Sequence, residues 1–408
     1  MKNKRILIVS QVFWPENFKI NDLCSDLIKK GYDITILTGK PNYPKGEFYD
    51  GYSFFSKNND LFKGAKIIRV PIITRGNGSG IRLSLNYLSF AFFGSLFALF
   101  HWRRYDFSLV FGVSPITAAI PAIIHRIIYK TKMALWVQDL WPESVDVTGK
   151  LKSSFLRNLL VLLVKFIYQQ SDKIFVSSEF IKKSIIEKLG SKHNKNIYYL
   201  PNWAEDTYLG ENVDTNKYLS LMPEGFKIMF AGNISFGQDF PSIIKAALIL
   251  KKTSNVKFVI LGDGSEKNYL IDQIRELKLN DTIYYLGSFP LEEMTNLYYH
   301  ADMMLLTLRD EPIYSYTVPC KLQGYLASKK PVAGMINGEA AEIIKKSKCG
   351  FVVNAEDYKA LAAELLSISK MPVSFLEEAK HKGFTYYEKT FKKEAVISSF
   401  LESTRTLK

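Results

Sequence analysis

The chain is organised around the stretch Trp136-Val137-Gln138-Asp139-Leu140-Trp141-Pro142-Glu143-Ser144. The apolar run 133–137 predicts a short buried strand, which cannot continue past Pro142 because proline lacks an N–H for the sheet ladder. Two carboxylates and two indoles therefore lie at a strand end. In open α/β sheets, ligands bind outside the carboxyl ends of the strands, so this cluster is a candidate site. From these residues alone, a structural turn with packed tryptophans is an equally good interpretation.

The composition indicates a two-domain globular protein with anionic partners. A chain of 408 residues exceeds what one core usually covers, and 47% of it is apolar. Lys and Arg outnumber Asp and Glu by 54 to 40, and the net charge of +14 favours phosphorylated ligands or an anionic membrane surface. No Cys/His finger or aromatic RNA-binding pattern occurs, so we expect no nucleic-acid partner.

The cysteines and histidines give no sign of disulfides or metal. Cys24, Cys320 and Cys349 are odd in number and widely spaced, which predicts reduced thiols and a cytoplasmic location. The five histidines lack metal-ligand spacing, and the apolar run before Gln11 is too short for a signal peptide. We therefore expect no bound metal or cofactor.

Strand and helix patterns alternate along the chain, which predicts an α/β fold with parallel sheets and right-handed crossovers. The first seven predicted strands cover 5–9, 33–38, 66–70, 107–112, 133–137, 173–176 and 197–200. A polar, irregular stretch over 204–225 predicts a domain boundary. A second set of strands follows at 227–231, 256–261, 283–285, 303–306, 331–334 and 350–353. We expect doubly wound Rossmann-like domains over 1–204 and 205–386, with a final helix over 387–408 packing back on the first.

Residues 83–102 carry no formal charge and raise the question of a membrane span. Serines, Asn86 and His101 interrupt the run, and the surrounding strand and helix pattern continues unbroken. A buried or membrane-facing helix is therefore the favoured interpretation, with a transmembrane helix as the alternative. Arg103 and Arg104 would suit an anionic headgroup layer.

Glycine-bearing turns follow three strands of the predicted second sheet, at 232–237, 262–264 and 286–290. Such turns present backbone N–H groups to phosphates, although each alone is more often only a tight turn. Thr317 and Pro319 are suitable helix starters, and Lys321 would lie in the first turn. Together they predict a nucleotide site, with ordinary helix capping as the alternative for the last stretch.

Six motifs in the chain resemble the GT-B glycosyltransferases, and more narrowly the retaining family 4 enzymes of bacterial O-antigen, capsule and colanic acid assembly, L-N-acetylfucosaminyltransferases among them. The motifs are Trp14-Pro15-Glu16, Pro41-Asn42-Tyr43-Pro44-Lys45-Gly46, Val137 to Ser144, Phe230-Ala231-Gly232-Asn233-Ile234, Pro319-Cys320-Lys321-Leu322-Gln323 and Lys330-Pro331-Val332. The resemblance implies two domains facing across a cleft and metal-independent sugar transfer from a nucleotide-sugar. It also implies a lipid-linked acceptor at the inner face of the cell membrane.

The resemblance also implies site residues. Asp139 would orient the sugar or acceptor, and Glu143 would hold its loop or accept the acceptor hydroxyl proton. The expected donor-binding residues are Gly232, Asn233, Gln238, Gly262, Gly264, Ser288, Phe289, Glu311, Thr317, Pro319, Lys321 and Gln323. The expected acceptor-side residues are Glu16, Asn17, Lys19, Asn42, Lys45, Gln138 and Trp141.

The sequence departs from the family pattern where charge matters most. The usual phosphate-binding Arg and Lys fall on Asn233 and Gln238, so backbone N–H groups, Lys321 or Arg309 must neutralise the diphosphate. The paired glutamates of the family fall on Tyr316 and Gly324, which leaves Glu311 or Gln323 as substitutes. The family's His-Asp pair appears as Gln138-Asp139.

These observations favour a retaining transferase that moves a sugar, expected to be an N-acetylated deoxy-aminosugar, from a UDP-sugar to an undecaprenyl-diphosphate-linked saccharide. One alternative is a UDP-sugar epimerase of the same fold, which would need paired carboxylates at the sugar ring. Another is a non-catalytic membrane scaffold of a polysaccharide assembly complex, which the missing phosphate cations would suit.

Overall fold

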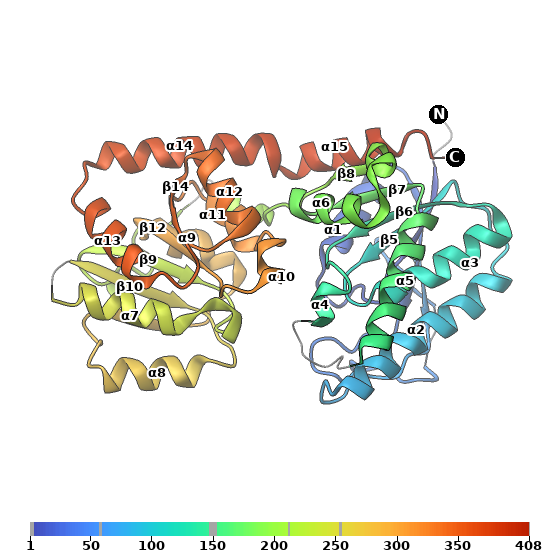
Figure 1. The fold of residues 1–408 in the computed structure, drawn as a ribbon, viewed down its shortest axis with the longest axis horizontal. Helices are drawn as coiled ribbons and strands as arrows, with labels where there is room; N and C mark the ends of the chain where they lie inside the picture. Colours follow the sequence, from blue (N-terminus) through green and yellow to red (C-terminus); the bar gives the residue numbers. More distant parts are fainter. Residues whose placement is uncertain (1–3, 57–58, 147–152, 211–212, 253–254, 408) are drawn as a thin grey trace. The chain divides into compact units, whose positions relative to one another are not determined.

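A computed structural model describes residues 4–56, 59–146, 153–210, 213–252 and 255–407 (Figure 1). The chain divides into two compact units. The first comprises Met1–Leu200 and Ile397–Lys408, and the second comprises Pro201–Val396. The division after Leu200 lies slightly before the boundary expected after residue 204.

The first unit is built on an eight-stranded sheet in the order β3-β4-β2-β1-β5-β6-β7-β8. Its strands are β1 (Arg5–Val9), β2 (Asp33–Gly39), β3 (Asn59–Phe62), β4 (Ala65–Val70), β5 (Phe107–Gly112), β6 (Lys132–Val137), β7 (Lys173–Val176) and β8 (Ile197–Tyr199). The paired strands are parallel except β3 against β4. Continuous apolar runs such as β6 suit this arrangement because helices cover both faces of a parallel sheet.

The crossover helices of the first unit begin and end where local chemistry predicts. They are α1 (Lys19–Lys29), α2 (Gly80–Phe100), α3 (Ile120–Tyr129), α4 (Glu143–Asp146), α5 (Ser154–Gln170) and α6 (Glu179–Leu189), with short 3-10 turns at Ile116–Ala119 and Ser191–Asn196. Ser178 caps α6 by accepting the Ile181 N–H at 3.0 Å. Gly31, at φ +84°, follows the end of α1, as predicted.

The second unit has a six-stranded parallel sheet in the order β11-β10-β9-β12-β13-β14. Its strands are β9 (Phe226–Ala231), β10 (Val256–Leu261), β11 (Ile283–Gly287), β12 (Met303–Thr307), β13 (Val332–Met335) and β14 (Gly350–Val353). Its main helices are α7 (Phe240–Leu250), α8 (Lys267–Glu276), α9 (Met294–Tyr299), α10 (Pro312–Ser315), α11 (Cys320–Ala327), α12 (Gly338–Ser347) and α13 (Tyr358–Ile368). Alternate residues of β9 pack into two apolar cores, Phe230 into one and Met229 into the other. Both faces of this sheet are therefore covered.

Two parts of the sequence prediction were wrong. The antiparallel edge strand β3 was not expected. The single helix predicted over 387–408 is two helices, α14 (Val373–Thr390) and α15 (Lys393–Thr404). Helix α14 ends because Phe391 is fully buried in a core of the second unit, and the N–H groups of Phe391 and Lys392 both donate to Tyr387 O.

Candidate active site

Asp139 lies at the carboxyl end of β6 and joins two neighbouring loops of the first sheet. Its Oδ2 accepts the Ser114 N–H at 2.8 Å, and the Trp141 indole donates to Ser114 Oγ at 3.0 Å. The carboxylate stays partly exposed, so one oxygen braces the loop after β5 while the group remains accessible. Gln138 beside it is also partly exposed.

The two indoles of this stretch are packed into the first unit. Trp136 is fully buried and donates to Leu200 O at 3.1 Å. Trp141 is 7% exposed and meets the Tyr87 ring edge-on, with ring centres 6.4 Å apart. Both tryptophans therefore position the Asp139 loop, and the face of Trp141 is not available for stacking on a sugar.

Glu143, at the start of α4, forms an ion pair with Lys188 of α6. The Lys188 Nζ lies 2.7 Å from Glu143 Oε1 and also donates to Trp141 O at 3.3 Å. Of the two expected roles, this geometry fits loop support: the lysine fastens the carboxylate and the loop backbone to the next helix.

Glu16 braces two loops at the same edge of the sheet. Its buried carboxylate accepts the N–H groups of Phe13 at 3.1 Å, Asn42 at 2.9 Å and Tyr43 at 2.7 Å. Burial raises the pKa of Glu16, and these three N–H groups oppose the rise. Its lone pairs face the protein, so the structure gives Glu16 a positioning role and not the acceptor contact expected of it.

The remaining acceptor-side residues differ in accessibility. Asn42 is buried and donates to Lys40 O at 2.9 Å, which makes it part of the loop scaffold. Asn17 and Lys45 are exposed, and Lys19 is partly exposed. All three side chains therefore reach the surface of the first unit, Lys19 only in part.

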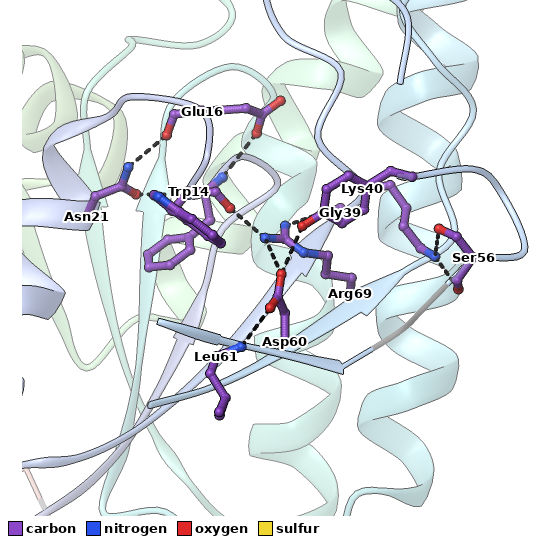
Figure 2. Close-up of polar contacts among 11 residues, drawn as sticks. Trp14, Glu16, Asn21, Gly39, Lys40, Ser56, Asp60, Leu61 and Arg69 are labelled. Carbon is purple, nitrogen blue, oxygen red and sulfur yellow. Dashed lines mark hydrogen bonds and ion pairs between the residues drawn. The ribbon is translucent and has the colours of Figure 1, made fainter. Parts of the chain in front are cut away.

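A buried cation that the sequence analysis missed lies beneath these loops (Figure 2). Arg69 of β4 donates to Trp14 O at 2.6 Å and lies 3.6 Å from the carboxylate of Asp60 on β3. Its guanidinium also lies over the Tyr52 ring, 5.0 Å from the centre. An arginine inside an apolar strand was the available signal, because a buried charge requires a partner.

Lys40 makes a second set of polar contacts beneath the same loops (Figure 2). Its Nζ donates to Ser56 O at 2.6 Å and to Ser56 Oγ at 3.1 Å. Burial, and then the nearby charge of Arg69, lower the pKa of Lys40. The candidate acceptor loops therefore rest on a polar layer that joins β2, β3 and β4 to the loop after β1.

The glycine turns of the second unit lie side by side at the carboxyl ends of its strands. A Cβ at Gly262 would lie 1.8 Å from Gly232 O, and one at Gly264 would lie 2.3 Å from Ile234 O. Both glycines have positive φ, so only glycine fits this close approach. Gly262 N–H in turn donates to Gly287 O at 2.8 Å. The three predicted turns therefore form one continuous edge.

Lys321 brings a cation to this edge from the first turn of α11. Its side chain lies against Gly232, where a Cβ would be 3.0 Å from Lys321 Cδ, and its Nζ donates to Gln238 Oε1. The Nζ also lies 3.9 Å from the centre of the Phe230 ring. Burial lowers the pKa of Lys321 to about 7. A neighbouring anion would restore the charge, as in a phosphate site.

Arg309, after β12, supplies a second cation to the same glycine loop. Its Nε donates to Phe236 O at 2.8 Å, and its guanidinium lies 3.6 Å from the centre of the Phe236 ring. Lys321 therefore contacts both ends of the loop 232–238, and Arg309 contacts Phe236 within it. Asn233 is exposed on this loop.

Gly324, where the family has its second glutamate, has no room for a side chain. The Tyr208 ring would lie 3.1 Å from a Cβ there, and it stacks on Tyr298 with ring centres 5.6 Å apart. Gln323 is 1% exposed, and its amide nitrogen faces Pro319 O and Cys320 O, which does not fit a ribose contact. Glu311 is exposed and is the better substitute.

The other predicted donor residues line the same edge with ordinary local contacts. Ser288 is exposed, and Phe289 meets the Tyr218 ring edge-on. Thr317 donates to Tyr314 O at 3.1 Å, and Pro319 precedes α11. Within the described ranges no cluster of three His, Cys, Asp or Glu side chains could hold a metal ion.

The comparison with known families agrees with this geometry. Residues 217–387 match the family described as Glycosyl transferases group 1. The matched residues lie within the second unit. They include the glycine edge and Lys321.

The sequence relatives of the chain are distant. An uncharacterized glycosyltransferase of Methanocaldococcus jannaschii is 28% identical over 178 residues, which cover 41% of this chain and 42% of the relative. TuaH of Bacillus subtilis, assigned to teichuronic acid biosynthesis, is 24% identical over 48% of each chain. WcaL of Salmonella typhimurium, assigned to colanic acid biosynthesis, is 27% identical over 36% of this chain and 37% of its own. The matches thus span about half or less of these relatives.

Solved structures identify the fold over the whole chain. Sucrose-phosphate synthase from Thermosynechococcus elongatus superposes with a TM-score of 0.75 at 14% identity, covering 100% of this chain and 99% of its own. Anabaena HepE in complex with UDP superposes with a TM-score of 0.69 at 14% identity, covering 99% and 100%. The two sheets, of eight and six strands, therefore form a GT-B fold, as predicted.

Proposed function

We propose that the protein is a retaining glycosyltransferase that uses a UDP-sugar donor and a polyprenyl-diphosphate-linked saccharide acceptor in surface polysaccharide biosynthesis. The observation that carries the proposal is Lys321, a lysine with a lowered pKa held against a glycine loop. Helix N-termini, backbone N–H groups and a cation together stabilise a leaving diphosphate without a metal. The expected donor sugar is an N-acetylated deoxy-aminosugar.

The comparisons support the choice of donor and pathway. HepE, which shares the fold, was solved with UDP, and TuaH and WcaL are assigned to teichuronic acid and colanic acid biosynthesis. A net charge of +14 suits a protein that works on anionic lipid at the inner face of the cell membrane. We propose that the protein is cytoplasmic and peripherally associated with that membrane.

Each of the site residues has a separate role in the proposed reaction. The acceptor hydroxyl oxygen bonds to the anomeric carbon on the face from which UDP leaves, and the hydroxyl proton passes to the departing phosphate oxygen. Lys321 and Arg309 neutralise the diphosphate. They take the role of the family's Arg and Lys, whose positions here hold Asn233 and Gln238. Asp139 orients the reacting groups. No protein nucleophile is needed in this route.

The test incubates the purified protein with a panel of UDP- and GDP-sugars and a synthetic lipid-diphosphate sugar. We expect transfer from a UDP-sugar with the donor's anomeric configuration retained. No transfer, or an inverted product, would contradict the proposal. Conversion of the UDP-sugar to its epimer without acceptor would establish the epimerase alternative, and a lack of UDP binding in calorimetry would favour the scaffold.

A further inference from the structure

Helix α2 of the first unit has most of its large apolar residues on its exposed face, although Phe90 is buried. The exposed side chains follow helical spacing along one stripe: Ile81, Leu85, Leu88, Phe92, Leu96, Leu99 and Phe100. The buried side includes small or polar residues: Asn86, Ser89, Ala91, Gly94 and Ala98. A helix facing water in a folded protein has the opposite distribution. We define this row of exposed residues as the α2 stripe.

The buried side of α2 is fitted to the protein and keeps the helix on the unit. The Gln11 amide donates to Asn86 Oδ1 at 2.7 Å, and Ser89 Oγ accepts the Ile73 N–H at 2.9 Å. A Cβ at Gly94 would lie 2.7 Å from Pro121 of α3, so the two helices are in close contact. Although α2 is long and apolar enough to span a bilayer, these contacts favour a helix lying on the unit.

Two neighbouring helices also expose apolar residues: α3 packs against α2, and α5 packs against α3 (Figure 1). Helix α3 exposes Ile127 and Ile128 at its end, and α5 exposes a stripe of its own: Phe155, Leu156, Leu159, Leu162 and Phe166. An apolar groove of about 430 Å³ adjoins α2, lined by Ile68, Pro71, Phe93, Leu96, Phe97 and Phe100 among others. Apolar surface of this extent in a folded protein marks an interaction site.

The charges around this surface identify what it binds. The sequences of α2, α3 and α5 contain no Asp or Glu. Exposed cations lie along it and at its borders: Arg82, Arg104, Lys130 and Lys165. Trp102, beyond the end of α2, is 82% exposed, as suits a residue at a membrane interface. Exposed apolar stripes with basic borders and no acidic residue match an anionic phospholipid bilayer.

The same helix also reaches the candidate acceptor loops. Tyr87 of α2 meets Trp141 of the Asp139 loop, and Asn86 holds Gln11 after β1. Leu85 and Leu88 of the α2 stripe therefore lie within one helical turn of the residues that contact these loops. We propose that the exposed faces of α2, α3 and α5 are a membrane-docking surface that seats the acceptor's lipid in the bilayer beside the Asp139 loop. This inference rests on the proposed function for its acceptor.

The test measures binding of the purified full chain to vesicles of phosphatidylcholine with and without phosphatidylglycerol. We expect binding to the anionic vesicles and a partition coefficient at least about thirtyfold lower for the triple variant Leu88→Ser, Phe92→Ser, Leu96→Ser. The matched control is Leu248→Ser with Ile249→Ser, on the exposed side of α7 in the second unit, which should bind like the wild type. Brominated lipid should quench the fluorescence of Trp102, and Trp102→Phe should remove that quenching.

Several outcomes would overturn the docking surface. These are no vesicle binding by the wild type, unchanged binding by the triple variant, and a wild-type dimer that the triple variant converts to a monomer without any vesicle effect. Two measurements distinguish a failure of this inference from a failure of the proposed function: UDP affinity, and sugar transfer to a short-chain, water-soluble acceptor. Both should survive in the triple variant, and their absence from the wild type would contradict the transferase and not the surface.

Discussion

The lowered pKa of Lys321 predicts that UDP binding is coupled to proton uptake. Burial lowers this pKa to about 7 in the free protein, so the amine is mostly neutral above that pH. A diphosphate beside Nζ favours the ammonium and raises the pKa. Because the ligand prefers the protonated form, UDP affinity should fall as the pH rises above about 7.

The size of the effect follows from the linkage. Between the free and the bound pKa of the lysine, each pH unit weakens binding about tenfold, or about 1.4 kcal/mol. A pKa near 7 leaves about one amine in ten protonated at pH 8, so binding there should take up about 0.9 proton. From pH 7 to pH 8.5 the dissociation constant should rise by up to about sixteenfold.

Calorimetry at pH 8 in buffers of different ionisation enthalpy measures the proton uptake directly. Lys321→Met should bind UDP weakly, with no proton uptake and a flat pH profile. It should also raise the free energy of unfolding at neutral pH by about 1–2 kcal/mol, because it removes a poorly solvated ammonium. The control Lys245→Met, at an exposed lysine of α7, should behave like the wild type. Proton uptake near zero in the wild type, or an unchanged pH profile in Lys321→Met, would refute the reasoning.

Three further substitutions test the other parts of the site. Asp139→Asn should lower kcat by about a hundredfold or more while UDP affinity changes less than about threefold, measured by transfer kinetics and calorimetry; an equal loss of both would remove the orienting role. Glu16→Gln should lower the free energy of unfolding by about 1–3 kcal/mol in urea titration, because an amide nitrogen would face backbone N–H groups, whereas the exposed Asn17→Ala should be neutral. Gly262→Ala should destabilise the second unit and abolish UDP binding, because its Cβ would meet Gly232 O. The control Gly78→Ala, with positive φ but open space around it, should lower the free energy of unfolding by only about 1 kcal/mol. Equal effects of the two substitutions would contradict the loop-contact argument.

Local patterns were sufficient to predict most of the fold. Apolar runs such as 107–112 and 256–261 coincide with strands because parallel strands are buried on both faces. Strand β3 was missed because Asn59-Asp60-Leu61-Phe62 is half polar and depends on its antiparallel partner β4. The helix break near Phe391 was missed for a similar reason: burial in a distant core ends α14, and no glycine or proline marks the place.

The candidate site could be predicted by position but not by role. The strand ends pointed to Asp139, the glycine turns and Lys321, all of which lie where expected. Glu16 and Gln323 have the right residue types at the right edges, yet their polar atoms face the protein. The Arg69 and Asp60 pair could not be predicted from spacing, because it joins a loop and three strands through tertiary contacts alone. Side-chain direction therefore decided which predicted residues are accessible.

The return of residues Ile397–Lys408 to the first unit has a consequence for biosynthesis. Lys4 Nζ donates to the backbone carbonyls of Thr404 and Leu407, at 2.8 and 3.1 Å, and Phe400 packs against Phe175. The first 200 residues of the first unit are made long before these partners; at about 5–20 residues per second the wait is on the order of 10–40 s. During that time the amino-terminal part of the first unit lacks its contacts with residues 397–408. The second unit, whose segments are contiguous, can complete its core before the first one does.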